Sequence, residues 1–181
     1  MLKRLGALTL AVGLCLPYGC DVRPITGVWQ NVPTIVLLGV PVLATLIYVL
    51  HTLVPTLAAF HERHSRTLHA VFRVVYYALL GGFLALAVTK RDGWPGPIEV
   101  AAALVVTGVL AVWPQHRGTS AARLPLLLLT VVGVPEVAYL VGFLREGGVQ
   151  LGGWVFTAGW VLAVLAEVQV LAASPPNPHG G

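Results

Sequence analysis

Long apolar stretches separated by short polar segments dominate the sequence from residue 32 to residue 173. A membrane-spanning helix needs about 20 mostly apolar residues, because each residue adds about 1.5 Å along a hydrocarbon core of about 30 Å. Five stretches come close to that length or exceed it. The predicted spans are 32–60, 70–89, 97–113, 124–144 and 151–173. We therefore predict an all-α, polytopic helix bundle with about five transmembrane helices.

The composition leads to the same class of protein. The chain is 57% hydrophobic and 10% charged, whereas about 25% of the residues of a soluble domain are charged. Its charges are too few to cover a water-facing surface, so the lipid bilayer is the expected solvent. The polar segments between the spans are too short to fold alone, so 20–173 is predicted to form one bundle, followed by a flexible polar tail at 174–181.

Residues 1–19 have the pattern of a signal peptide. Lys3 and Arg4 precede an apolar run of 12 residues, and Pro17 ends that run. This length is short for a membrane span and ordinary for the core of a signal peptide. The segment is therefore either a signal peptide or a short N-terminal anchor.

Cys20 is a candidate lipidation site. Gly19-Cys20 resembles the lipobox of bacterial lipoprotein signals, where a small residue precedes the cysteine that is lipidated. Pro17 stands where that pattern prefers Leu, and Asp21 follows as in lipoproteins that stay in the inner membrane. The resemblance implies a bacterial protein lipidated at Cys20, with conventional cleavage and an uncleaved anchor as alternatives.

Both interpretations of the N-terminus place residue 21 outside, because Lys3 and Arg4 start inside. The segments 61–69 and 114–123 then face the cytoplasm. Five basic residues fall inside and four outside, so the positive-inside rule favours this orientation by a narrow margin. The expected location is the bacterial cytoplasmic (inner) membrane. The eleven Lys and Arg residues are dispersed among the loops without a nucleic-acid-binding motif, so the net charge of +4 does not indicate a nucleic-acid partner.

Two short phrases occur twice in the sequence. GVPVLATL at 39–46 returns as GVPEVAYL at 133–140, and LGGF at 80–83 returns as LGGW at 151–154. If the N-terminal segment stays as a sixth helix, the chain divides into two inverted halves of three helices, as in many secondary transporters. The alternative is a chance match between two kinked helices in a chain rich in Gly, Val, Leu and Ala.

The second copy of the longer phrase carries an acid, Glu136, in the middle of a predicted span. Pro135 precedes it, cannot donate a backbone hydrogen bond, and is expected to kink the helix. Glu136 could then bind a carbonyl freed at the kink or the hydroxyl of Tyr139. The alternatives are a proton or cation site and a catalytic acid, because ionisable groups within spans are often functional. Glu167, in the last span, is the second candidate acid.

Histidines provide the only candidate cofactor ligands. His51 and His69 lie nine residues on either side of Phe60, where a turn is expected, so they could face each other and ligate a haem or a metal. The chain contains neither HExxH nor CxxCH and offers no third ligand at a defined spacing. The alternative is a solvated polar loop. The sequence therefore predicts no cofactor, with haem as the alternative.

No motif in the sequence identifies a reaction, since GxSxG and a phosphate-binding glycine loop are both missing. Glycine and alanine on the helices favour close packing with other membrane helices. The sequence therefore favours a structural or accessory subunit of a bacterial inner-membrane complex, without catalytic activity and with other membrane subunits as partners. The alternatives are a small transporter or proton-coupled carrier using Glu136, and a haem- or quinone-associated protein using His51 and His69.

Overall fold

The computed structural model describes residues 1–17, 32–89, 96–113, 118–146 and 148–174, and the side chains of 32–38 and 146 are not described. All regular structure in these ranges is helical. The helices are α1 (Leu2–Cys15), α3 (Val32–Leu53), α4 (Pro55–Arg63), α5 (Ser65–Thr89), α6 (Pro97–Val112), α7 (Ser120–Glu146) and α8 (Leu151–Ala173).

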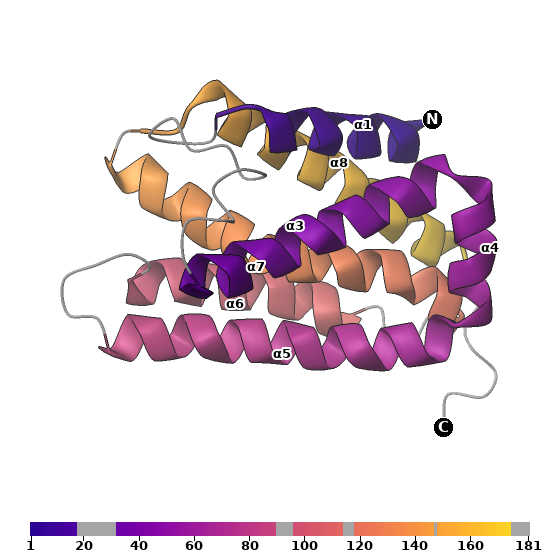
Figure 1. The fold of residues 1–181 in the computed structure, drawn as a ribbon, viewed down its shortest axis with the longest axis horizontal. Coiled ribbons are helices and arrows are strands. Elements are labelled where there is room, and N and C mark those ends of the chain that lie inside the picture. The colour runs from indigo at the N-terminus through magenta and orange to yellow at the C-terminus, as the bar shows by residue number, and fades with distance from the viewer. Residues whose placement is uncertain (18–31, 90–95, 114–117, 147, 175–181) are drawn as a thin grey trace.

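Helix α7 forms the centre of the bundle and packs against α3, α5, α6 and α8 (Figure 1). Its sequence is apolar on every side, and a helix of that kind is stable only when other helices or lipid surround it. Leu124, Leu128, Val131 and Val134 are accordingly almost fully buried. Helix α1 lies on the outside of this arrangement, against α8 and α3.

The long helices run side by side along the length of the bundle, and each reverses the direction of the one before it (Figure 1). Three of them, α5, α7 and α8, are long and apolar enough to cross a membrane. The bent pair α3–α4 would add a fourth span, and α6 is apolar but has only 16 residues. The prediction of an all-helical membrane protein is therefore supported, whereas the count of about five transmembrane helices is not confirmed.

The first predicted span, 32–60, is not one helix. Helix α3 ends at Leu53, and α4 continues from Pro55 at an angle of 112°. Proline disfavours helical geometry in the residue before it, and Val54 is accordingly extended, with φ −113° and ψ 103°. The segment 61–69, expected as a loop, is mostly helical, because α4 ends at Arg63 and α5 begins at Ser65.

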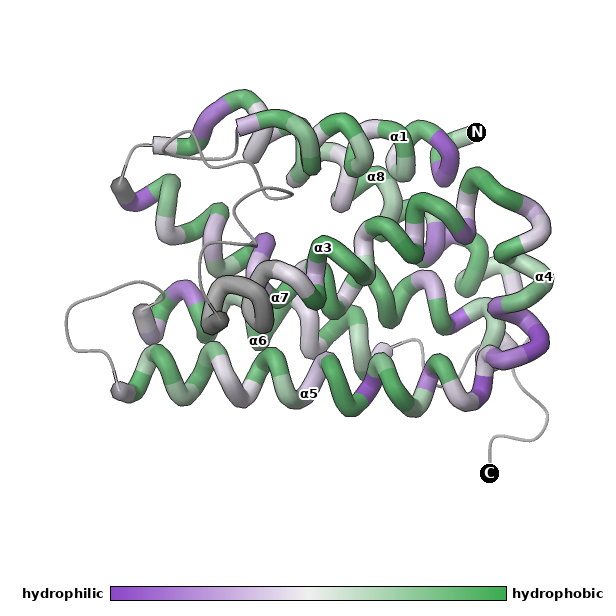
Figure 2. The backbone as a smooth tube through the Cα atoms, viewed as in Figure 1, coloured by the Kyte–Doolittle hydropathy of each residue, from purple (hydrophilic) through white to green (hydrophobic). Residues whose placement is uncertain are grey.

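Apolar side chains cover much of the outer surface. Val74 and Val88 on α5, and Val105 and Val112 on α6, are each at least 60% exposed. Figure 2 shows the same pattern along the backbone, with hydrophobic residues over most of each helix and hydrophilic residues gathered around α4. A surface of this composition suits contact with lipid acyl chains.

Glycines bring α1 and α8 into backbone contact. A Cβ atom on Gly6 would lie 2.8 Å from the backbone nitrogen of Ala163, and one on Gly13 would lie 2.7 Å from Cα of Phe156. On the opposite side, a Cβ atom on Gly159 would lie 2.6 Å from the backbone nitrogen of Leu10. Such close approach of two helices gives extensive van der Waals contact, which is the main packing force between helices in lipid.

The repeated phrase GVP lies in α3 and α7, and these two helices are in contact. Within the described residues their surroundings differ. Helix α7 packs against α5 and α8, but no comparable packing joins α3 to either of those helices. An inverted repeat would favour equivalent helix contacts in the two halves of the chain. The two halves do not have equivalent contacts.

Candidate functional site

Among the side chains that the structure describes, three glutamates are buried between the helices: Glu99 on α6, Glu136 on α7 and Glu167 on α8. None is more than 4% exposed. An isolated carboxylate at such a position would be strongly destabilising, because it loses its hydration without compensation. Each of the three instead meets a polar side chain that belongs to another helix.

Glu167 lies at the junction of three helices. The Nζ atom of Lys3, on α1, is 2.7 Å from its Oε1 atom, and the hydroxyl of Tyr48, on α3, donates a hydrogen bond of 3.2 Å to the same oxygen. Glu167 is almost completely buried, whereas the side chain of Lys3 is 32% exposed. One carboxylate therefore ties α8 to both α1 and α3. Sequence reasoning identified Glu167 but missed Lys3, because the N-terminal segment was considered as a signal.

Two histidines lie next to this cluster. His51 follows Tyr48 by almost one turn of α3, and its ring stacks on that of His61, with centroids 5.1 Å apart and planes 10° apart. The bend before α4 folds His61 back over the end of α3. The Nδ1 atoms of both rings are buried without a hydrogen-bond partner. The ring that lies against His51 is therefore that of His61 and not that of His69.

The predicted His51–His69 pair is not assembled in this structure. His69 lies on α5, where it lines a pocket with Arg73 and Arg123. Among the described residues, no three His, Cys, Asp or Glu side chains gather in a way that could hold a metal ion. The haem or metal hypothesis gains no support from this geometry.

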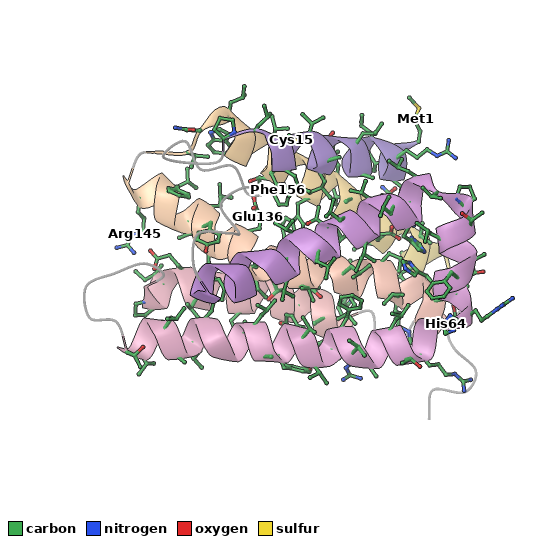
Figure 3. The ribbon with its side chains drawn as sticks, viewed as in Figure 1. Met1, Cys15, His64, Glu136, Arg145 and Phe156 are labelled. Atoms are coloured by element: carbon green, nitrogen blue, oxygen red, sulfur yellow. The ribbon has the colours of Figure 1, made fainter. Side chains whose placement is uncertain are left out.

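Glu136 faces α8 from the middle of α7 (Figure 3). The hydroxyl oxygen of Thr157 lies 2.5 Å from its Oε1 atom and 2.8 Å from the carbonyl oxygen of Gly153. A hydroxyl donates to one acceptor at a time. If Glu136 is protonated, both bonds form together, because the acid donates to Thr157 and Thr157 donates to Gly153.

The other residues predicted beside Glu136 are Pro135 and Tyr139. Helix α7 continues through Pro135 without interruption. The ring of Tyr139 packs against Phe83 and Phe143, with centroids 6.3 and 6.5 Å away. Glu136 thus has a partner, Thr157, that sequence reasoning missed.

Gly133, the first residue of the repeated phrase, has a packing role. The indole ring of Trp160 lies against it, so that a Cβ atom on Gly133 would be 2.6 Å from Cζ2. The same indole donates a hydrogen bond of 2.8 Å to the carbonyl oxygen of Leu129 on α7. The glycine therefore allows Trp160 to connect α8 to α7 by packing and by a hydrogen bond.

Glu99 and Arg145 form the third pair, between α6 and α7. The Nη1 atom of Arg145 is 2.5 Å from Oε1 of Glu99. Arg145 is 58% exposed and lies at the opposite end of the bundle from Met1 and His64 (Figure 3). Glu99, in the first turn of α6, therefore lies at this end of the bundle and not in its middle.

Glu136 and Glu167 do not form a carboxyl pair. The partner of Glu136, Thr157, is ten residues from Glu167 along α8, which corresponds to about 15 Å. The three acids instead form a series of separate connections: α6 to α7, α7 to α8, and α8 to α1 and α3. The candidate lipidation site, Cys20, lies outside the described residues.

In comparisons with known proteins, no family model matches the chain, and no curated protein or solved structure has significant similarity to it.

Proposed function

We propose that this chain is a structural or accessory subunit of a bacterial inner-membrane complex, without catalytic activity of its own. The observation that carries the proposal is the use of the three buried acids. Each connects one helix to another through a basic or hydroxyl side chain. The three acids, which would otherwise be candidates for catalysis, therefore hold the helices together. The apolar outer surface is available to lipid and to neighbouring subunits.

The orientation that we propose places the end carrying α4 in the cytoplasm and residue 21 outside. With this orientation the sequence has seven basic residues on the cytoplasmic side and four outside. The seven are Lys3, Arg4, Arg63, Arg66, Arg73, Arg117 and Arg123, and the four are Arg23, Lys90, Arg91 and Arg145. Basic residues concentrate on the cytoplasmic side of membrane proteins, so the count favours the proposed direction.

Of the alternatives for the N-terminus, we propose the retained anchor. Cleavage before Cys20 would remove α1, and with it the glycine contacts to α8 and the cation beside Glu167. A signal peptide has no need of such a fit to a helix at the far end of the chain. Intact-mass measurement of the purified protein tests this proposal: the mass should include residues 1–19, and a chain that begins at a lipidated Cys20 would contradict it.

The subunit proposal is tested by the state of the protein in its native membrane. The chain should be extracted in mild detergent after chemical cross-linking of the membrane, and the particle should be sized with its detergent contribution subtracted. We expect a stoichiometric cross-link to another integral membrane protein and a particle larger than one chain. A particle of one chain without a cross-linked partner would contradict the proposal.

A second candidate function, a proton-coupled carrier, is favoured by Glu136 and Thr157. The carboxyl group of Glu136 can take up and release a proton while the hydroxyl of Thr157 keeps its own, so the acid could carry a proton within the bundle. Proteoliposomes loaded with a pH-sensitive dye would detect proton flux through the unaltered chain. Glu136→Gln should abolish that flux and Glu99→Gln should not, whereas flux that survives Glu136→Gln would eliminate this site.

A further inference from the structure

A pocket at the α4 end of the bundle combines cationic and apolar walls. It lies between α5, α6 and α7, and we call it the α5–α7 pocket. His69, Arg73 and Arg123 provide its polar wall, and Tyr77, Leu110 and Leu127 are among its apolar residues. Two guanidinium groups from different helices therefore border a single cavity.

The α7 side of the pocket holds its arginine in place. Arg123 donates from Nη2 to the carbonyl oxygen of Gly118 over 3.1 Å and from Nε to that of Thr119 over 3.4 Å. These bonds fix the guanidinium at the start of α7. Arg73, one turn after His69 on α5, is exposed. The pocket thus has one guanidinium held by backbone hydrogen bonds, that of Arg123, and one at the exposed surface, that of Arg73.

The surface around the pocket is strongly apolar. Tyr77 is 53% exposed, and Val109, Val112 and Trp113, at the end of α6 that contributes Leu110, are exposed to a similar degree. Tryptophan is enriched where the hydrocarbon of a bilayer meets its headgroups. The two cations therefore lie at the boundary between an acyl-chain surface and the polar end of the bundle.

We infer that the α5–α7 pocket binds the phosphate group of an anionic glycerophospholipid. Planar guanidinium groups match phosphate oxygens in charge and geometry, and basic pockets between helices on the cytoplasmic side are suited to anionic headgroups. The cavity has a volume of about 20 Å³, room for one water-sized group. One phosphate oxygen can enter it, while the acyl chains lie along the exposed residues of α5 and α6.

The inference is tested by comparing two lipids with identical acyl chains, phosphatidylglycerol and phosphatidylcholine. Each is bound to the purified, delipidated full-length protein. Native mass spectrometry of the protein in detergent gives both affinities. We expect phosphatidylglycerol to bind about thirtyfold more tightly, because each of the two arginines near the membrane surface attracts an anionic lipid by about 1 kcal/mol. Inorganic phosphate in excess should not displace the lipid, since it lacks the acyl chains.

Two charge-matched double variants identify the site. Arg73→Gln with Arg123→Gln should remove the preference for phosphatidylglycerol, whereas Arg63→Gln with Arg66→Gln removes the same charge outside the pocket and should preserve it. Arg73→Gln alone should weaken the preference without disturbing the start of α7. Equal affinity for the two lipids, displacement by inorganic phosphate, or equal losses in the two double variants would overturn the inference.

Discussion

Lys3 and Glu167 form an ion pair, and the two side chains differ in their exposure to solvent. The acid is almost completely shielded from solvent, while the side chain of Lys3 keeps about a third of its exposure. The attraction is strengthened by the low polarity around the acid, and the partial hydration of Lys3 reduces the cost of burying the cation. The pair is therefore better suited to hold a helix in place than a pair with both partners fully buried.

Removal of Lys3 should reveal how much this pair contributes. Lys3→Met leaves Glu167 buried with the hydroxyl of Tyr48 as its remaining donor. We expect a loss of about 2 kcal/mol in the free energy of unfolding, between the effects of breaking exposed and buried pairs. Titration with SDS in mixed micelles would measure it. Arg4→Met, which removes a neighbouring exposed charge, should change the free energy by less than about 0.5 kcal/mol.

The double variant Lys3→Met with Glu167→Gln completes the test. If the pair acts as described, the second substitution should recover part of the stability, because no uncompensated charge then stays buried. Strictly additive losses in the double variant would show that the two groups act independently.

The burial of the acids could be predicted from sequence, but most of their partners could not. The positions of Glu136 and Glu167 within apolar runs indicated that water would not reach them. Their partners, Thr157 and Lys3, are on other helices, and the choice depends on which helices are adjacent and how they are rotated. Hydropathy carries no information on either property.

Helix α1 depends on three glycines for its close fit to α8. Gly159→Ala would place a methyl group against the backbone of α1. We expect a loss of about 1–3 kcal/mol in stability, typical of overpacking at a tight contact. Gly81→Ala is the matched control, because a Cβ atom there meets nothing within 4 Å. That variant should be neutral or slightly more stable, since alanine favours a helix by about 1 kcal/mol over glycine.

The same mixed-micelle titration distinguishes the two glycine variants. Equal stability changes at Gly159 and Gly81 would show that the close approach of α1 to α8 does not contribute to folding. Gly13→Ala offers an independent check on α1, because its methyl group would meet the backbone of Phe156 on α8.

The helices themselves were largely predictable, and their ends were less so. Runs of apolar residues located α5, α7 and α8 because a helix in lipid needs little more than length and hydrophobicity. The end of α3 was missed because hydropathy stays high through Pro55. The backbone geometry imposed by proline, rather than polarity, sets that boundary.

At the scale of the whole bundle, the N-terminus and residue 174 lie at the same end. Residue 174 lies at the end of α8 near Lys3 and α4, and Arg145 lies at the other end (Figure 1, Figure 3). With the orientation proposed above, both the N-terminus and residue 174 face the cytoplasm. This arrangement follows from the even number of long helices between them, α1, α3, α5, α6, α7 and α8.

Cysteine labelling of intact cells would determine the orientation. In a background with Cys15→Ser and Cys20→Ser, a membrane-impermeant maleimide should react with Arg145→Cys from outside and should reach Ser174→Cys only after the cells are opened. Permeabilised cells provide the control that both thiols are reactive. The reverse pattern would invert the proposed topology.

At the level of the whole chain, composition was sufficient to predict a helical membrane protein. It was insufficient to show that the N-terminal segment belongs to the bundle, because its apolar run is as short as that of a signal peptide. The deciding features are reciprocal: Gly159 and Glu167 on α8 match Leu10 and Lys3 on α1. Such matches become apparent only once the two helices are aligned.

The pairing of the first helix with the last has a consequence for biosynthesis. Helix α1 leaves the ribosome first, but the surface that receives it is completed only when residues 151–173 have been made. Until then, Lys3 has no acid beside it and the glycine-lined face of α1 is open to lipid or to an insertion chaperone. Final closure of the bundle is therefore a late event, and ribosomes that stop before α8 should release chains that membrane proteases degrade rapidly.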